Sequence, residues 1–575
     1  MIMSFCHRNR LLAIMLSIAL AGVAAAAPVP LTDANAATLS AESALQRGDC
    51  GAASTLYLKA SQLLAQAELA QRATAVALEC GQVATALAGA ERWVKLAPGD
   101  TPAALARVRA ALAGFHVPDA QEYFRAWLGG ADRKVPEAID ELAQGVGNEA
   151  LLLMLRGLDH PALRSSAAQR ALAELALESW DATAALKYAQ GARTAGARSA
   201  DLAALVSRAQ AVLGNEPAAL AAAHEAAGRK DGDAGDAGDE GALAVAQTLL
   251  LLGKSAAAEA ELQRLRSDAT GGTAASRQLA QLAFEQGDYA LAEQRSSLLL
   301  RDPASSVLAV YLLGVIAERR GDEAAALRHY AALLDTGFDA AGRRRAAGIL
   351  YRQGEHEAAL RVFAPARNAG PAERIRADIA VADLLSLVDA PEESLGRIDG
   401  ALRRTPGNPE LDYQRAVLLE RAGKIEAALK LLESLHRARP QDAAVTNALG
   451  YTLADHKRAL PRAEQLIREA LQSQPDSPAI LDSLGWVLYR RGQAAAAVPV
   501  LARAYRLLHD GDVGAHWGEA LWGAGQHAAA RAAWQRALAA DPDNKGLNAT
   551  LAKFAPDIRA PVPPPALEAA PRTSI

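Results

Sequence analysis

A sequence pattern recurs every 33 to 35 residues near the C-terminus of the chain. Each copy contains a glycine followed by two alanines that lie seven residues apart. The three sets are Gly450, Ala463 and Ala470; Gly485, Ala497 and Ala504; and Gly518, Ala530 and Ala537. Alanines seven apart lie on one face of a helix, where small side chains let a second helix approach closely. A unit of this length cannot bury an apolar core alone, so its copies are expected to stack into a solenoid.

The pattern continues towards the N-terminus through glycines at the predicted turns between helices. An alanine stands five residues after each of ten such glycines. These glycines are Gly48, Gly81, Gly214, Gly253, Gly287, Gly321, Gly354, Gly423, Gly492 and Gly525. With the weaker copies between them, the period gives about fifteen helical hairpins. Residues 545–554 follow the last hairpin and are predicted to form a helix that caps it.

A period near 34 residues, with a small residue early, alanines later and a closing proline such as Pro475 or Pro542, resembles the tetratricopeptide repeat (TPR). The resemblance implies an all-α fold, a TPR superhelical solenoid of about fifteen helical hairpins with a C-terminal capping helix. The composition agrees, because the chain is 51% hydrophobic but only 4% aromatic. Cores of alanine and leucine suit closely packed helices, whereas sheets favour β-branched and aromatic residues.

Residues 1–26 are typical of a secretory signal peptide. Arg8 and Arg10 precede an apolar run over residues 11–23, and the three alanines at 24–26 offer a cleavage site. We therefore predict export to the periplasm of a bacterial envelope, with an uncleaved membrane anchor as the alternative. Cys6 precedes the apolar run, so no cysteine stands where a bacterial lipoprotein would be acylated.

The remaining chain is predicted to form two TPR blocks, an N-terminal block over 27–227 and a C-terminal block with its capping helix over 242–554. Residues 228–241 between them are rich in glycine and aspartate and are predicted to be a flexible linker that acts as a hinge. A calcium loop is not predicted there, because Asp236 occupies the sixth place, where such a loop needs glycine. Residues 555–575 contain a run of prolines and are predicted to be a disordered tail.

Two cysteines follow the predicted signal peptide, Cys50 and Cys80, and both fall at the tips of neighbouring hairpins. In an oxidising compartment they could form a disulfide, provided that their Cα atoms lie within about 7 Å. Two unpaired, half-buried thiols are the alternative. The sequence leaves this choice open.

Motifs that would indicate catalysis or cofactor binding are incomplete. Gly253-Lys254-Ser255 imitates the end of a phosphate-binding loop, but Thr248 stands where the motif needs glycine. The eleven histidines form no zinc-type HExxH pair, and no Gly-x-Ser-x-Gly elbow occurs. The net charge of −4 argues against nucleic acid as the main partner. We therefore predict a protein without enzymatic activity, cofactor, metal site or small-molecule substrate.

The TPR resemblance also implies a surface for partners, because the first helix of each TPR hairpin lines a concave groove. Carried onto the last three repeats, the inward positions are Asn447, Tyr451, Asp455, Asp482, Trp486, Tyr489, Arg490, Glu519 and Trp522. Tyrosine and tryptophan at such positions can anchor a peptide or a partner helix with little loss of entropy. The alternative is that Trp486 and Trp522 pack between repeats. His516 lies three residues before Glu519, so this pair could also orient a ligand, and the alternative is that the pair is simply solvated.

Three runs carry a narrower resemblance: NALGYTLADHKRALPRAEQLIREAL, PAILDSLGWVLYRRGQAAAAVPVLARAY and HWGEALWGAGQHAAARAAWQRAL. They resemble the C-terminal repeats of TPR proteins of the proteobacterial envelope, which are usually outer-membrane lipoproteins. One branch acts as adaptors that bring substrates to a periplasmic carboxyl-terminal processing protease. The resemblance implies a non-enzymatic periplasmic scaffold or adaptor that binds proteins, with peripheral association at the outer membrane. The alternative is a scaffold for export or assembly of envelope polymers.

Overall fold

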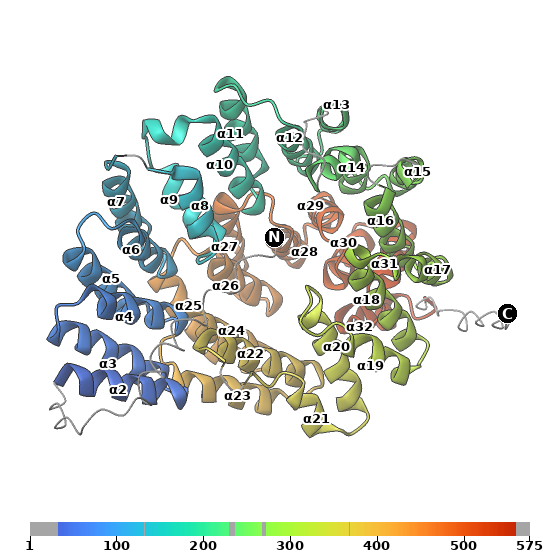
Figure 1. The fold of residues 1–575 in the computed structure, drawn as a ribbon. Helices are drawn as coiled ribbons and strands as arrows, with labels where there is room; N and C mark the ends of the chain where they lie inside the picture. Colours follow the sequence, from blue (N-terminus) through green and yellow to red (C-terminus); the bar gives the residue numbers. More distant parts are fainter. Residues whose placement is uncertain (1–32, 132, 229–235, 267–271, 367–368, 559–575) are drawn as a thin grey trace, which may run out of the picture.

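The computed structural model describes residues 33–131, 133–228, 236–266, 272–366 and 369–558. Within these ranges the chain consists of α-helices and one short 3₁₀ helix, with no strand. The helices form fifteen successive pairs followed by a single helix (Figure 1). The expected all-α solenoid of about fifteen hairpins is therefore confirmed.

The first helices of the hairpins are α2 (Asp33–Gln46), α4 (Ala67–Glu79), α6 (Thr101–Ala113), α8 (Val135–Ala143), α10 (Ser166–Glu178), α12 (Ala200–Val212), α14 (Asp236–Leu251), α16 (Gly272–Glu285), α18 (Pro303–Arg319), α20 (Asp339–Arg352), α22 (Pro371–Leu387), α24 (Pro409–Arg421), α26 (Ala443–Asp455), α28 (Pro478–Arg490) and α30 (Gly511–Gly523). The second helices are α3 (Cys50–Leu63), α5 (Val83–Leu96), α7 (Val117–Leu128), α9 (Asn148–Arg156), α11 (Ala182–Thr194), α13 (Glu216–Gly228), α15 (Ser255–Arg266), α17 (Tyr289–Leu299), α19 (Glu323–Ala331), α21 (His356–Arg361), α23 (Pro391–Arg404), α25 (Ile425–Ala438), α27 (Leu460–Ser473), α29 (Ala494–Leu507) and α31 (His527–Ala540). The 3₁₀ helix η1 (Pro161–Arg164) precedes α10, and α32 (Lys545–Phe554) follows the last hairpin.

The ten glycines singled out in the sequence all lie at hairpin tips. Each has a φ between 64° and 84°, the left-handed conformation in which a helix commonly ends and the chain reverses. Four further tips place a larger residue in the same conformation: Phe115, Trp180, Asp389 and Lys457. Because these four tips lack the turn glycine, the repeat pattern in the sequence marks their hairpins less clearly.

The ten alanines that follow those glycines are buried between helices, each with 0% exposure. The helical glycines of the C-terminal repeats also lie at close helix contacts. A Cβ on Gly485 would lie 2.3 Å from Leu501 Cγ of α29, and a Cβ on Gly518 would lie 1.9 Å from Trp534 Nε1 of α31. Small residues therefore recur because the two helices of each hairpin leave no room for larger ones.

Residues 228–241 do not form a linker over their whole length, contrary to the prediction. Helix α13 ends at Gly228 and α14 begins at Asp236, so residues 236–241 are helical, and 229–235 lie outside the described residues. Ala226 of α13 and Ala244 of α14 belong to one buried cluster, so helices pack continuously across this segment. The apolar face of α14 thus outweighs the Gly/Asp composition of its first turn.

The two ends of the chain differ in how far the structure describes them. Helix α32 caps the last hairpin as predicted, with Leu547 and Leu551 buried. The packed region extends further than expected, because Ala555 and Ile558 join the same cluster. The predicted signal peptide at 1–26 and the rest of the predicted tail, 559–575, lie outside the described residues. No helix among the described residues is both long and apolar enough to cross a membrane.

Cys50 and Cys80 form a disulfide, with their Cα atoms 5.6 Å apart. Cys50 begins α3 and Cys80 directly follows α4, so the bond joins the tips of the first two hairpins. Of the two alternatives that the sequence left open, the structure therefore has the disulfide.

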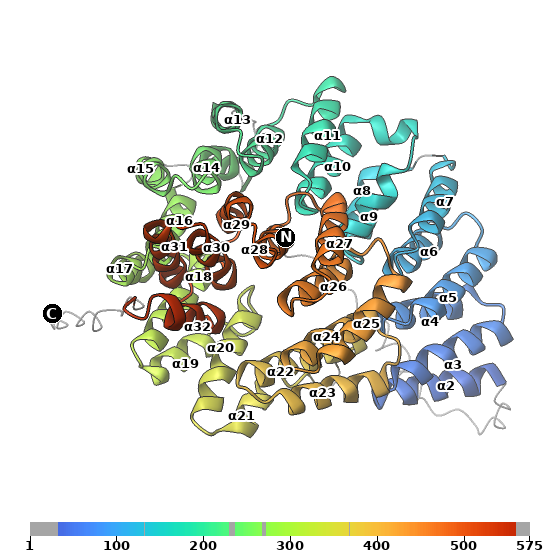
Figure 2. The ribbon, with the colours of Figure 1, turned by 180° about the vertical axis from the view of Figure 1, so that it is seen from behind.

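The stack of hairpins completes one turn of a superhelix and continues into a second, so that distant segments lie side by side (Figures 1 and 2). Where the turns meet, tips of first-turn hairpins face linkers between second-turn hairpins. Asn408 Nδ2 donates to the Cys80 carbonyl at 3.1 Å, across 328 residues of sequence. We call this boundary the seam. Hydrogen bonds across the seam join two sets of residues. The first-turn set is Gln46, Cys80, Gln82, Glu149, Trp180, Ala182, Ala211, Val212 and Leu251, and the second-turn set is Arg374, Pro406, Asn408, Ala443, Gln474, Asp476 and Arg506.

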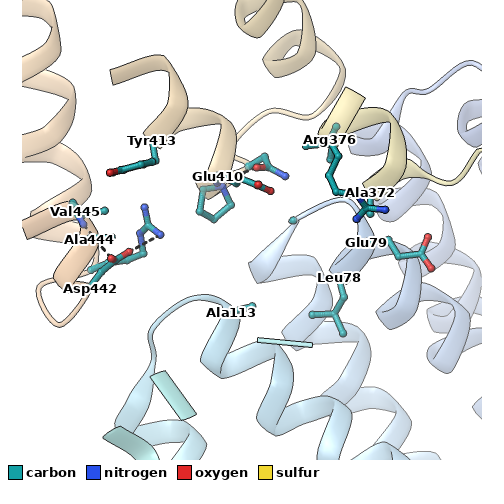
Figure 3. A pocket seen from close by; sticks show the side chains of 15 residues that line it. Leu78, Glu79, Ala113, Ala372, Arg376, Glu410, Tyr413, Asp442, Ala444 and Val445 are labelled. Atoms are coloured by element: carbon teal, nitrogen blue, oxygen red, sulfur yellow. Dashed lines mark hydrogen bonds and ion pairs between the residues drawn. The ribbon is translucent and has the colours of Figure 1, made fainter. Parts of the chain in front are cut away.

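A cavity of about 510 Å³ lies in the seam (Figure 3). Leu78 and Glu79 of α4 line it from the first turn, and Arg376 of α22 and Tyr413 of α24 line it from the second. The two turns therefore meet without packing tightly over this stretch.

Candidate partner-binding surface

The nine residues predicted to bind partners lie on the first helices of the last three hairpins. Asn447, Tyr451 and Asp455 are on α26; Asp482, Trp486, Tyr489 and Arg490 are on α28; Glu519 and Trp522 are on α30. These three helices pack side by side (Figure 1). The structure thus gathers all nine side chains into one region, which we call the C-terminal surface.

Trp486 lies at the centre of this region and is only 5% exposed. Its Nε1 donates to Asp455 Oδ1 of the preceding repeat at 3.1 Å. Arg490 lies 5.0 Å from the indole ring and 3.3 Å from the same carboxylate oxygen. This placement matches the packing alternative for Trp486.

His516 of α30 completes the packing around Trp486. The two rings stack with centroids 4.1 Å apart, and His516 Nδ1 lies 3.0 Å from the Asp482 carboxylate of the preceding repeat. The sequence reading paired His516 with Glu519 and missed Asp482. A separation of 34 residues, one full period, is the signal that could have found this pair, because equivalent positions of neighbouring repeats come into contact.

The charge of His516 is tied to its surroundings. Burial disfavours the imidazolium, but the carboxylates of Asp482, Asp512 and Glu519 outweigh that effect and raise the pKa of His516 above 6.5. A group whose pKa is higher in the folded state stabilises the fold below its unfolded pKa, and this contribution is lost as the pH rises through the folded pKa.

We therefore expect the melting temperature of the C-terminal repeats to fall as the pH rises from 6 through the folded pKa of His516. Replacing His516 with asparagine should flatten this dependence. Calorimetry between pH 6 and 9 on both proteins checks it. Glu149, whose pKa burial raises to about 7, titrates in the same range in both proteins and cancels in the comparison. An equally steep dependence in the variant would contradict the prediction.

The edge of the C-terminal surface is less buried than Trp486 at its centre. Tyr489 and Trp522 are half-buried, and Trp522 lies against Trp534 and Phe554, with ring centroids 5.8 and 5.9 Å away. Glu519 accepts a hydrogen bond from Thr550 of α32 at 3.1 Å. Both the burial of Tyr489 and the neighbouring Glu519 carboxylate raise the pKa of the tyrosine.

Asn447 presents an acceptor without a partner at this surface. Its amide oxygen Oδ1 is buried and receives no hydrogen bond from the described part of the chain. A buried acceptor of this kind is normally satisfied by water or by a bound group.

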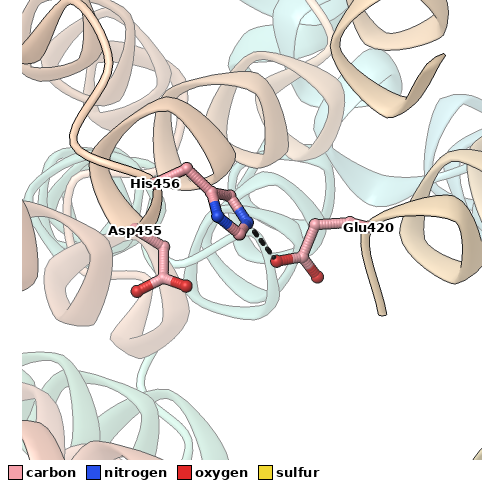
Figure 4. A group of neighbouring side chains, drawn as sticks. All are labelled: Glu420, Asp455 and His456. Atoms are coloured by element: carbon pink, nitrogen blue, oxygen red, sulfur yellow. Dashed lines mark hydrogen bonds and ion pairs between the residues drawn. The ribbon is translucent and has the colours of Figure 1, made fainter. Parts of the chain in front are cut away.

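Glu420, Asp455 and His456 form the group of described side chains that comes closest to a metal site (Figure 4). Their ligand atoms lie within 4.8 Å of one another, and His456 Nε2 lies 3.0 Å from Glu420 Oε1. Carboxylate and imidazole groups can bind a divalent cation. Here the histidine pairs with Glu420, and Asp455 accepts hydrogen bonds from Trp486 and Arg490, so each of the three side chains already has a partner within the protein.

Comparison with known families covers this same region. Residues 391–443, 413–478, 447–511 and 516–552 match the model of the tetratricopeptide repeat family. The chain is 34% identical over 207 residues to the TPR repeat-containing protein PA4667 of Pseudomonas aeruginosa. This alignment covers 36% of the chain and 35% of that protein, so the chain spans about a third of its relative's length.

Solved structures of TPR proteins are similar to the chain at low sequence identity. Yeast Tom70 is 13% identical, with 91% of this chain and 95% of that chain covered and a TM-score of 0.31. TTC0263, a TPR protein of Thermus thermophilus, is 19% identical, with 31% and 97% covered and a TM-score of 0.29. Together with the family match, the helical hairpins described above confirm the predicted fold as an all-α TPR solenoid.

Proposed function

We propose that this TPR solenoid is a non-enzymatic scaffold or adaptor of the bacterial periplasm. It binds other proteins on the C-terminal surface. The observation that carries this proposal is the pair of half-buried aromatic rings, Tyr489 and Trp522, on the adjacent helices α28 and α30. Rings of this kind supply rigid contact area to a bound partner.

The periplasmic location is supported by the signal-type sequence at 1–26 and by the disulfide between Cys50 and Cys80. Disulfides persist in oxidising compartments such as the periplasm and are rare in reducing ones. The narrower form of the proposal is an adaptor that brings substrates to a carboxyl-terminal processing protease. It rests on the resemblance of the C-terminal repeats to such adaptors.

The test replaces Tyr489 and Trp522 together with alanine and measures which envelope proteins the purified chain captures from an extract. We expect capture of its main partner to fall about 30-fold, the effect of losing one strong contact residue at an interface. Trp486 stays in place because its removal would disturb packing.

The matched control replaces Tyr123 and Tyr188, two half-buried tyrosines on second helices of N-terminal repeats. This control should capture the partner as the unchanged protein does. Undiminished capture by the Tyr489/Trp522 variant, with its helical content retained, would refute a binding role for this surface. Recovery of a protease supports the adaptor form, and recovery of polymer-export proteins would refute that form.

A further inference from the structure

We propose that the seam is a latch, which opens and closes the two-turn superhelix while the individual repeats stay folded. Opening would change the pitch of the superhelix and thus the spacing between the inner surfaces of its two turns. This inference concerns the molecule alone and does not depend on the proposed binding function.

Packing between the two turns is interrupted along the seam. Two cavities, of about 510 and 180 Å³, both lie between residues of the first and second turns. Gly48 and Cys50 line the smaller one together with Arg374 and Arg404. Neighbouring hairpins instead bury continuous clusters of alanine and leucine. A boundary interrupted by open pockets gains less dispersion energy than a continuously packed one, so the seam is weaker than the contacts within each turn.

Polar side chains make the hydrogen bonds across the seam, and Leu507 of α29 adds an apolar contact with the first-turn core. Arg506 of α29 donates to the carbonyls of Ala211 and Val212 at the end of α12, at 3.0 and 3.2 Å. It also donates to the Leu251 carbonyl at the end of α14, at 2.8 Å. One guanidinium therefore serves the C-termini of two helices, where carbonyls lack partners and a positive charge is favoured.

Two carboxylates accept hydrogen bonds from backbone amides at helix N-termini across the seam. Asp476 accepts from the Ala182 amide at the start of α11 at 2.8 Å, and its own amide donates to the Trp180 carbonyl at 2.9 Å. Glu149 accepts from the Ala443 amide at the start of α26 at 3.1 Å. Water can replace every one of these bonds when the turns separate.

The seam also has a fixed end. The disulfide holds together the first two hairpin tips, and the second of these carries Cys80, whose carbonyl bonds to Asn408. Next to it, Gln82 Nε2 donates to the Pro406 carbonyl at 2.9 Å. The tips therefore present a rigid edge to the second turn.

Arg506 allows a direct test, because all its hydrogen bonds named here cross the seam. In the Arg506→Met variant the aliphatic stem is kept and the guanidinium is lost. Hydrogen exchange with mass spectrometry should then show exchange about tenfold faster at both seam edges, including segments 148–150 and 442–444 that Arg506 does not touch. The radius of gyration from solution scattering should rise, and helical content should stay unchanged.

The control is Arg462→Met, which removes an exposed arginine paired with Glu433 inside the second turn. It should leave exchange at the seam unchanged, and Arg506→Lys should restore much of the protection. Faster exchange confined to 211–215 and 251–254 would overturn the latch, because opening would then be local. Unchanged exchange together with an unchanged radius of gyration would overturn it as well.

Discussion

Replacing Trp486 with alanine is expected to lower the free energy of unfolding of the C-terminal repeats by about 3–5 kcal/mol. The indole is 5% exposed and packs between the ring of His516 and the guanidinium of Arg490. Alanine would leave a void between α28 and α30, and Asp455 would lose the indole hydrogen bond. The side chains around the void belong to rigid helices, so they can collapse into it only in part.

Chemical denaturation followed by far-UV circular dichroism measures this loss. Because a solenoid can unfold in parts, the transition of the C-terminal repeats is the one to analyse. A Trp486→Phe variant keeps a six-membered ring but loses the rest of the indole and its hydrogen bond, so it should cost less than the alanine variant, about 2 kcal/mol. A loss below 1 kcal/mol for Trp486→Ala would mean that the side chain is not part of the core.

Removing the disulfide is expected to destabilise the N-terminal repeats by about 3–4 kcal/mol. The bond closes a loop of 30 residues between Cys50 and Cys80, and it limits the conformations of the unfolded chain. Both cysteines are buried at adjacent tips, with exposures of 3% and 0%. The loss should therefore appear mainly in α2 to α5, as earlier unfolding of these helices.

A Cys50→Ala/Cys80→Ala variant, measured with and without reductant, checks this prediction. The unchanged protein should lose stability on reduction, whereas the variant should not respond. A Cys6→Ser variant that keeps Cys50 and Cys80 is the control for thiol counting. It should show no free thiol when it is denatured without reductant, because its two remaining cysteines are bonded to each other. Two free thiols in that version before reduction would contradict the disulfide.

The repeat could be predicted from the sequence because it depends on contacts between neighbours. The alanine five residues after each turn glycine meets the partner helix of its own hairpin, and all ten such alanines are fully buried. The same reasoning placed the nine residues of the C-terminal surface on three adjacent first helices. The repeat pattern could not show which of these nine side chains are exposed, because the burial of Trp486 depends on how His516 of the next repeat is oriented. Whether this surface binds partners stays a prediction.

The sequence by itself determined the unit of this protein: a helical hairpin of about 34 residues, repeated fifteen times, with small residues where its helices touch. Only the tertiary structure decided how the units add up. The pitch of the superhelix is the sum of many small rotations between hairpins, each set by local packing. No single residue encodes that sum. The contacts of Arg506, Asp476 and Glu149 across about 300 residues therefore leave no periodic trace in the chain.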